Sequence, residues 1–127
     1  MPTQWEMYLH DDFQPEFDAL VPAVQDALLA LARAVEIAGP MAGRPHVGTR
    51  ANPKHPNMKE LRFTALNGTR VWRAAFAFDP QQKGLILVAA DKQGKEEMKF
   101  YKALVAKANR RFDAHLAALA KAKKARK

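Results

Sequence analysis

The strongest structural constraint in this sequence is a β-hairpin signal at Asn67-Gly68. Asn-Gly is a preferred pair for a two-residue hairpin turn, because both residues tolerate the positive φ angles that the turn requires. Strand-like segments rich in apolar and β-branched residues flank it, over residues 58–66 and 69–78. We therefore predict two antiparallel strands joined directly by this turn.

A two-residue turn also fixes which residues face each other across the two strands. Phe63 then lies opposite Trp72, an aromatic pair suited to the core side of the sheet. One step along, Arg62 lies opposite Arg73 on the other side, and like charges directly opposite each other destabilise a strand pair. Two interpretations stay open: this face binds an anion, or Glu60 on the same side pairs with an arginine on an exposed, salt-bridged face.

Three further cations lie near this arginine pair in the sequence. Arg70 precedes Arg73 by three positions, so on one strand the two side chains point to opposite faces. Lys59 and Lys92 stand at the ends of what we predict to be adjacent strands, where they would flank an anion site. Lone surface lysines are more often simply solvated, and by composition alone this remains the alternative for both.

Apolar periodicity and turn residues predict the remaining elements. The first half of the chain is predicted to hold a short strand over residues 4–9, a helical stretch that Asp11 or Asp12 caps, and a helix over 22–38 that Gly39-Pro40 ends. A long Pro-rich loop over 40–57 follows. After the hairpin come a strand over 85–90, whose unbroken apolar run is typical of burial on both faces, and a helix over about 96–120. We expect an α+β fold: a small antiparallel-dominated sheet with two N-terminal helices and a C-terminal helix, the helices packed on one face. The expected organisation is one domain over residues 1–120 and a basic tail over 121–127.

Charge is distributed unevenly along the chain. The formal net charge is +8, with 21 Lys and Arg against 13 Asp and Glu. Residues 1–40 hold seven acids and one arginine, a net charge of −6, whereas residues 41–127 hold twenty bases and six acids, a net charge of +14. A basic surface of this kind suits a polyanionic partner, most commonly nucleic acid, and the alternative is a solvated basic face with a solubilising tail.

Several kinds of chemistry have no support in the sequence. Cysteine and serine are absent, which excludes thiolate zinc sites, a cysteine nucleophile and a Ser-His-Asp triad. The four histidines show no metal-ligand spacing, and no dinucleotide, P-loop or zinc-protease motif is present, so we expect neither a metal nor a cofactor. Because no apolar run is long enough to span a bilayer and the start lacks a signal-peptide pattern, we expect a cytoplasmic protein without a membrane partner.

Taken together, three strand segments resemble one known family. They are N-M-K-E-L-R-F at residues 57–63, V-W-R-A-A-F-A-F-D-P at 71–80 and L-I-L-V-A-A-D-K at 85–92. This combination resembles the RelE/ParE toxin superfamily, and within it the HigB-like, phage-derived branch. Trp5-Glu6, Gly39-Pro40 and the pattern of Phe100-Tyr101 and Arg111-Phe112-Asp113 fit as well, so the resemblance covers about residues 4–116.

The resemblance implies the toxin of a type II toxin–antitoxin pair, and specifically a metal-independent endoribonuclease that cleaves mRNA on the ribosome. Arg62 and Arg73 would hold the scissile phosphate, Lys59 and Lys92 would flank it, and Tyr101 would be the nearest aromatic hydroxyl. The residues expected to border the bound RNA are Arg44, Arg50, Lys54, His55 and Arg70.

The resemblance also implies a partner and leaves a second function open. The partner is a cognate antitoxin, expected to be of helix-turn-helix type and encoded next to this chain. Because the superfamily includes gyrase-poisoning toxins, the alternative function is a toxin-fold protein that binds gyrase or nucleic acid without catalysis.

Overall fold

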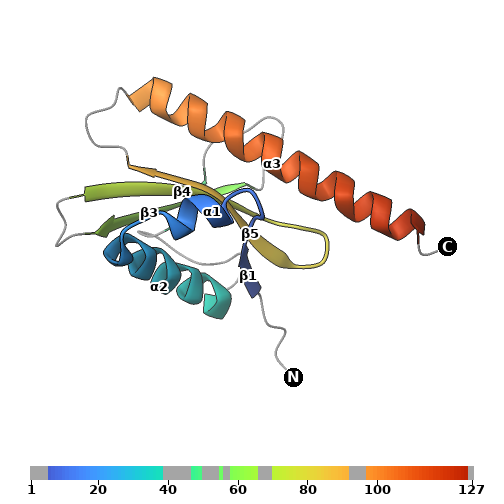
Figure 1. Cartoon of the computed structure of the whole chain (residues 1–127), viewed down its shortest axis with the longest axis horizontal. Coiled ribbons are helices and arrows are strands. Elements are labelled where there is room, and N and C mark those ends of the chain that lie inside the picture. The colour runs from blue at the N-terminus through green and yellow to red at the C-terminus, as the bar shows by residue number, and fades with distance from the viewer. Residues whose placement is uncertain are drawn as a thin grey trace.

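The computed structural model describes residues 6–38, 47–49, 55, 58–65, 70–91 and 97–125. The elements are β1 (Glu6–Leu9), α1 (Gln14–Asp18), α2 (Pro22–Ala38), β2 (Val47–Thr49), β3 (Lys59–Ala65), β4 (Arg70–Phe78), β5 (Lys83–Asp91) and α3 (Glu97–Ala125). The strands form one sheet in the order β1-β5-β4-β3-β2, in which β1 pairs parallel to β5 and every other neighbouring pair is antiparallel (Figure 1). The predicted α+β class with an antiparallel-dominated sheet is confirmed.

The register of β3 and β4 is the predicted one. Arg62 pairs with Arg73 and Phe63 pairs with Trp72. The two aromatic rings stack at an interplanar angle of 19°, with 6.2 Å between their centroids. Asn67-Gly68, from which the register was predicted, lies outside the described residues. The strand pairing on which the arginine pair depends is therefore confirmed.

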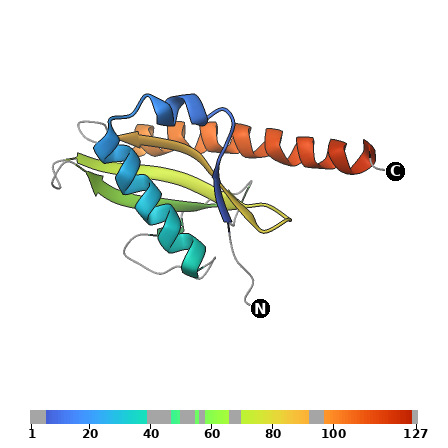
Figure 2. The same cartoon turned by 60° about the horizontal axis from the view of Figure 1, so that its bottom comes forward.

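The helices cover both faces of the sheet, so the prediction that they share one face is wrong. Figures 1 and 2 show α2 against one face and α3 running across the other (Figure 1, Figure 2). Successive residues of a strand point to opposite faces, and β4 is apolar on both alternations over its second half. Phe76 accordingly joins the core under α1 and α2, while its neighbours Ala75 and Ala77 join the core under α3. Each apolar face needs its own cover, which a single layer of helices cannot supply.

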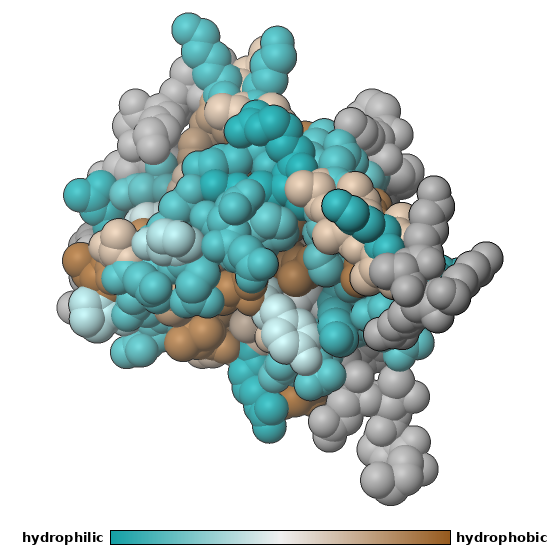
Figure 3. All heavy atoms as spheres, turned by 45° about the vertical axis from the view of Figure 1, so that its right-hand side comes forward, coloured by the Kyte–Doolittle hydropathy of each residue, from teal (hydrophilic) through white to brown (hydrophobic). Residues whose placement is uncertain are grey.

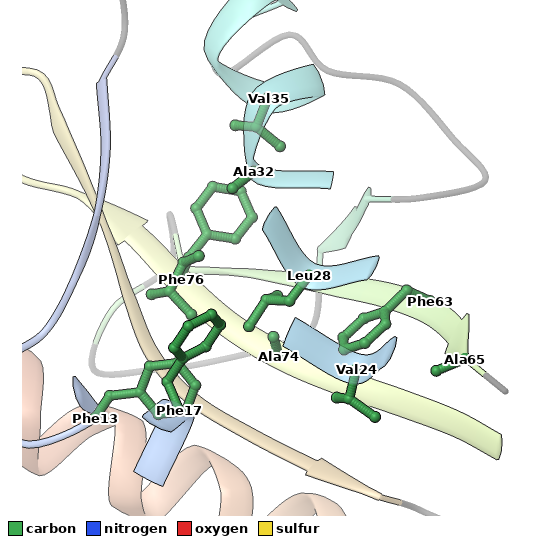
Figure 4. Packing of buried hydrophobic residues seen from close by; sticks show 11 residues of the cluster. Phe13, Phe17, Val24, Leu28, Ala32, Val35, Phe63, Ala65, Ala74 and Phe76 are labelled. Carbon is green, nitrogen blue, oxygen red and sulfur yellow. The ribbon is translucent and has the colours of Figure 1, made fainter. Parts of the chain in front are cut away.

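The core between α2 and the sheet is built from the apolar stripe of that helix. Leu28 and Val24 are almost fully buried, at 0% and 2% exposure, and they reach toward Ala74 and Phe63 of the sheet (Figure 4). Burying each such side chain contributes about 1.5–3 kcal/mol. The helix spans residues 22–38 as predicted from its periodicity.

Three other predictions about elements need correction or extension. The segment 40–57, predicted as a loop, contains the short strand β2, which pairs with the first residues of β3. The predicted cap of the first helix is wrong, because the N-cap residue is Phe13 and no side chain caps it. The C-terminal helix was predicted to end near residue 120 but continues to Ala125, so most of the basic tail is helical.

Candidate nucleic-acid interface

Arg62 and Arg73 lie side by side on the face of the sheet that α3 covers, and a carboxylate and a phenol lie with them. The Arg73 Nε donates a hydrogen bond of 2.7 Å to the Tyr101 hydroxyl oxygen. Glu60 Oε1 lies 3.5 Å from the Arg73 Nε and 3.8 Å from the Arg62 Nε, and it accepts a 3.4 Å hydrogen bond from the Tyr101 hydroxyl. We call these four residues the arginine cluster.

The exposed fraction of the side chains differs across the arginine cluster. The side chains of Glu60 and Arg73 are 8% and 13% exposed, and Tyr101 is buried at 6%. Arg62 is 42% exposed and is therefore the member that solvent or a ligand reaches first. Two guanidinium groups share one carboxylate, so the cluster keeps a net positive charge at its open side.

The open side continues along β3 and β4, past the arginine pair toward Ala65 and Arg70. Thr64 and Val71 form the next strand pair beyond Arg62 and Arg73 on this face, and both are exposed. Tyr101 lies in the second turn of α3, so the helix covers the inner part of the cluster. A ligand approaching this face would meet the Arg62 guanidinium first.

The salt-bridged interpretation of the arginine pair is partly confirmed. Glu60 does pair with the arginines, as the salt-bridged alternative requires, but it is buried rather than part of an exposed face. A single carboxylate leaves the second guanidinium charge uncompensated within the cluster. The anion-binding interpretation stays a prediction, which this uncompensated charge favours.

The structure separates the other predicted site residues from this cluster. Lys59 is one position before Glu60 on β3, so its side chain leaves from the opposite face of the sheet. Arg70 forms an ion pair of 3.0 Å with Asp91 and lies on that opposite face too. β4 stands between β3 and β5, so the prediction that Lys59 and Lys92 end adjacent strands is wrong.

The remaining predicted RNA-binding residues divide into one that the structure describes and several that it does not. His55 lies against α3, where its Nε2 is 2.8 Å from Asp113 Oδ1 and its ring meets Phe112 edge-on at 4.9 Å. Asp113 is twelve residues, or about 18 Å along the helix axis, from Tyr101. The residues Lys92, Arg44, Arg50 and Lys54 lie outside the described residues.

Two side chains of α3, His115 and Arg111, make polar contacts that sequence reasoning missed. His115 Nε2 lies 2.8 Å from the Oδ2 of Asp79, whose side chain is 0% exposed. Burial raises the pKa of Asp79, but hydrogen bonds from His115 and from the Lys83 and Gln81 amides outweigh it and hold the pKa below its usual range. Arg111 binds both Glu16 and the Leu87 carbonyl oxygen. No local spacing signals such contacts, because the partners are far apart in the sequence.

The described residues contain neither a metal-binding cluster nor a helix that could cross a membrane. Within the ranges given above, no group of three or more His, Asp or Glu side chains is placed to hold a metal ion. Among the helices in those ranges, none combines the length and the apolar character that a membrane span needs.

Comparisons with known proteins place the chain in a family. The family model described as "Phage derived protein Gp49-like (DUF891)" matches residues 15–113, which include the whole arginine cluster. The chain is 35% identical to the Mycobacterium tuberculosis (strain ATCC 25618 / H37Rv) protein named "Putative toxin HigB2" over 92 residues, 72% of this chain and 45% of that protein. It is 38% identical to "Putative toxin HigB3" of the same organism over 73 residues, 55% of this chain and 60% of that protein.

The chain thus spans less than two thirds of the length of either relative. No solved structure matched it at a comparable significance. The family match covers more than half of the chain, and both relatives carry the name of the branch that the strand motifs resemble. The chain therefore belongs to the phage-derived Gp49-like family, and its resemblance to the HigB-like branch of the RelE/ParE toxin superfamily is confirmed.

Proposed function

We propose that this chain is the toxin of a type II toxin–antitoxin pair and that it cleaves mRNA on the ribosome at the arginine cluster. The observation that carries the proposal is the pairing of Arg62 with Arg73 around a single buried carboxylate, which leaves positive charge at an open sheet face. The family match and the toxin names of the two relatives support the assignment.

The proposed reaction needs no metal. The ribose 2′-oxygen attacks the adjacent phosphorus, its proton passes to a base, and the bond from phosphorus to the 5′-oxygen breaks as that oxygen takes up a proton. The products are a 2′,3′-cyclic phosphate and a 5′-hydroxyl end. Negative charge grows on the phosphate oxygens during attack, and guanidinium groups are suited to stabilise it.

The exposure of the cluster divides the roles of its arginines. Arg62 would contact the phosphate directly, because it is the exposed member. Arg73 would add to the electrostatic stabilisation of the phosphate from the buried side of the cluster, where Tyr101 and Glu60 hold its guanidinium in place. Tyr101 lies buried in the second turn of α3 with its hydroxyl already bonded to Arg73, so we assign it to positioning that guanidinium.

The proposed partners follow from the same surface. A cognate antitoxin, of helix-turn-helix type and encoded next to this chain, would neutralise the toxin, and an acidic segment laid over Arg62 would both bind and inhibit. The target would be mRNA in the ribosomal decoding site, which places the proposed activity in the cytoplasm.

A second function is favoured by one specific observation. Tyr101 is buried, the Arg73 side chain is 13% exposed, and both are already bonded to each other and to Glu60, as expected of a structural ion-pair network. On this alternative the chain binds gyrase or nucleic acid through Arg62 and performs no chemistry.

Induction of the chain in a bacterial host, with mapping of RNA 5′ ends, separates the two functions. The wild-type chain should arrest growth and create new mRNA ends, and Arg62→Ala should reduce those ends about 100-fold, as loss of one charge-stabilising donor does. Arg33→Ala is the matched control, because Arg33 is a 75% exposed arginine on α2. Growth arrest without new RNA ends would contradict the nuclease proposal, and DNA breaks in that case would indicate gyrase.

A further inference from the structure

The outward side of α3 has an unusual composition. From Lys99 to Lys123, every exposed side chain on this helix belongs to a cation or an alanine. The cations are Lys99, Lys102, Arg110, Lys121 and Lys123. Figure 1 shows the helix extending past the sheet toward the C-terminus, and Figure 3 shows hydrophilic side chains crowding the side of the molecule toward which it extends (Figure 1, Figure 3).

Among the described side chains, these cations have fewer acidic neighbours than a solvated helix usually carries. Exposed helices commonly alternate Glu and Lys at four-residue spacing, which stabilises the helix and balances its charge. Asp113 is the single acid among the α3 side chains that the structure describes, and it is engaged by His55 at 2.8 Å. Lys107, nearer the sheet, is paired with Glu16 at 3.2 Å. The five outward cations therefore outnumber the one acid described on α3, and they form a strip of net positive charge.

The geometry of the strip suits a phosphate backbone. Lys99, Lys102, Arg110 and Lys121 fall on one side of the helix at 3.6 residues per turn, and the first and last are about 33 Å apart along its axis. The fully exposed residues between them on this side are alanines, whose short side chains let a bulky duplex approach the helix closely. Asp113, which is half-buried and paired with His55, lies on the same side three positions after Arg110. A length of this order reaches several phosphates of a structured RNA.

Other partners suit the strip less well. A membrane-surface helix needs an apolar face to insert, but Phe100, Leu104 and Phe112 of α3 are buried against the sheet. Met98, in the first turn, is the single exposed large apolar side chain among the described residues of α3. Apolar anchors of the kind that dominate protein interfaces are missing from the strip as well, since alanine is the only uncharged residue on it.

We propose that this outward strip is a second RNA-binding surface, which holds the backbone of structured RNA without reading its sequence. The inference deepens the proposed function and rests on it for its biological role. A toxin that acts on ribosome-bound mRNA also has to bind next to ribosomal RNA. The strip lies on the same helix that covers the arginine cluster. Such binding depends steeply on salt, because each phosphate contact releases counterions.

A salt titration with two charge-matched variants tests the proposal. The probe is a short fluorescent RNA hairpin of arbitrary sequence, and the variants are Lys102→Ala/Arg110→Ala and the control Arg33→Ala/Lys83→Ala. Both doubles remove two exposed cations, but the control removes them from α2 and β5. The strip variant should bind at least tenfold more weakly, with the slope of log affinity against log salt reduced by about 1.5 to 2. The control should bind like the wild type.

Each other outcome overturns the proposal. Equal losses in both doubles would mean that only net charge matters, and no loss in the strip variant would mean that the strip touches no RNA. Competition by polyglutamate as effective as competition by unlabelled hairpin would identify the strip as a surface for acidic proteins. Thermal unfolding of both doubles checks that they are folded.

Failure of this inference and failure of the proposed function give different results. If the strip variant loses hairpin binding but wild-type chain produces no RNA ends, the strip stands and the nuclease assignment falls. If wild-type chain cleaves mRNA but the strip variant binds the hairpin normally, the nuclease assignment stands and this inference falls.

Discussion

Glu60 is the residue on which the arginine cluster depends. Its carboxylate is 8% exposed and lies within 4 Å of both opposed guanidinium groups. Without it, two like charges would face each other across β3 and β4 with nothing between them. The same carboxylate accepts the Tyr101 hydroxyl and so connects the sheet to α3.

Glu60→Gln should destabilise the fold by about 3 kcal/mol, because removing one partner of a buried ion pair leaves the other charge uncompensated. Urea unfolding measures the loss. Adding Arg62→Ala to Glu60→Gln should restore part of the stability, since one of the repelling charges is then gone. An unfolding midpoint unchanged by Glu60→Gln would show that solvent already screens the arginines.

Asp79 makes stability depend on pH in acid. Its pKa is lowered in the folded chain, because hydrogen bonds from His115 and two backbone amides outweigh burial. A lowered pKa stabilises the fold above the unfolded value of about 3.9, and this contribution is lost as pH falls through the folded pKa. Asp79→Asn should therefore lose about 1–3 kcal/mol at neutral pH.

Urea midpoints followed from neutral pH into strong acid test this prediction. The difference between wild type and Asp79→Asn should shrink below about pH 4. A difference that stays constant across that range would mean that the negative charge of the Asp79 carboxylate does not contribute to the stability of the fold.

At the scale of elements, α3 is tied to the rest of the fold through Arg111. The register between β4 and β5 shifts at Ala75 and Phe76, which leaves Leu87 as an extra residue in β5. The Arg111 Nη1 donates a 2.7 Å hydrogen bond to the Leu87 carbonyl oxygen, and the same guanidinium binds the carboxylate of Glu16 in α1. One side chain thus joins a bulge, α1 and α3.

Arg111→Ala should cost about 3 kcal/mol, because the side chain is 11% exposed and its loss leaves a buried carbonyl and the Glu16 carboxylate without their donor. Hydrogen exchange should show faster opening of α1 than of α2, which Arg111 does not touch. Thermal unfolding with Arg110→Ala as the exposed neighbouring control measures the difference. Equal effects of the two substitutions would contradict the linking role.

The elements differ in how far the sequence could predict them. The β3–β4 register was predictable because a two-residue turn fixes it, and α2 because its apolar stripe is long and regular. β2 was missed because three residues within a Pro-rich stretch show no periodicity. The unbroken apolar run of β5 did indicate that the sheet is covered on both faces. Which face α3 covers depends on tertiary contacts, which the sequence does not show.

At the scale of the whole molecule, the acidic and basic parts of the chain lie in different elements of the fold. The acidic first third forms β1, α1 and α2, and part of it is used internally, as where Glu16 meets Arg111 and Lys107. The basic remainder supplies the arginine cluster and the outward strip of α3. The opposition of Arg62 and Arg73 was predictable from register, whereas their contact with Tyr101 was not, because it depends on how α3 crosses the sheet.

The central claim is that the arginine cluster cleaves RNA, and purified components test it most directly. Ribosomes carrying a defined mRNA are mixed with the purified chain, and the 5′ ends that appear are mapped and tested for a free hydroxyl. The wild type and Arg33→Ala should produce 5′-hydroxyl ends at equal rates, and Arg62→Ala should be about 100-fold slower. Absence of new ends from the folded wild type, or equal rates for Arg62→Ala and wild type, would contradict it.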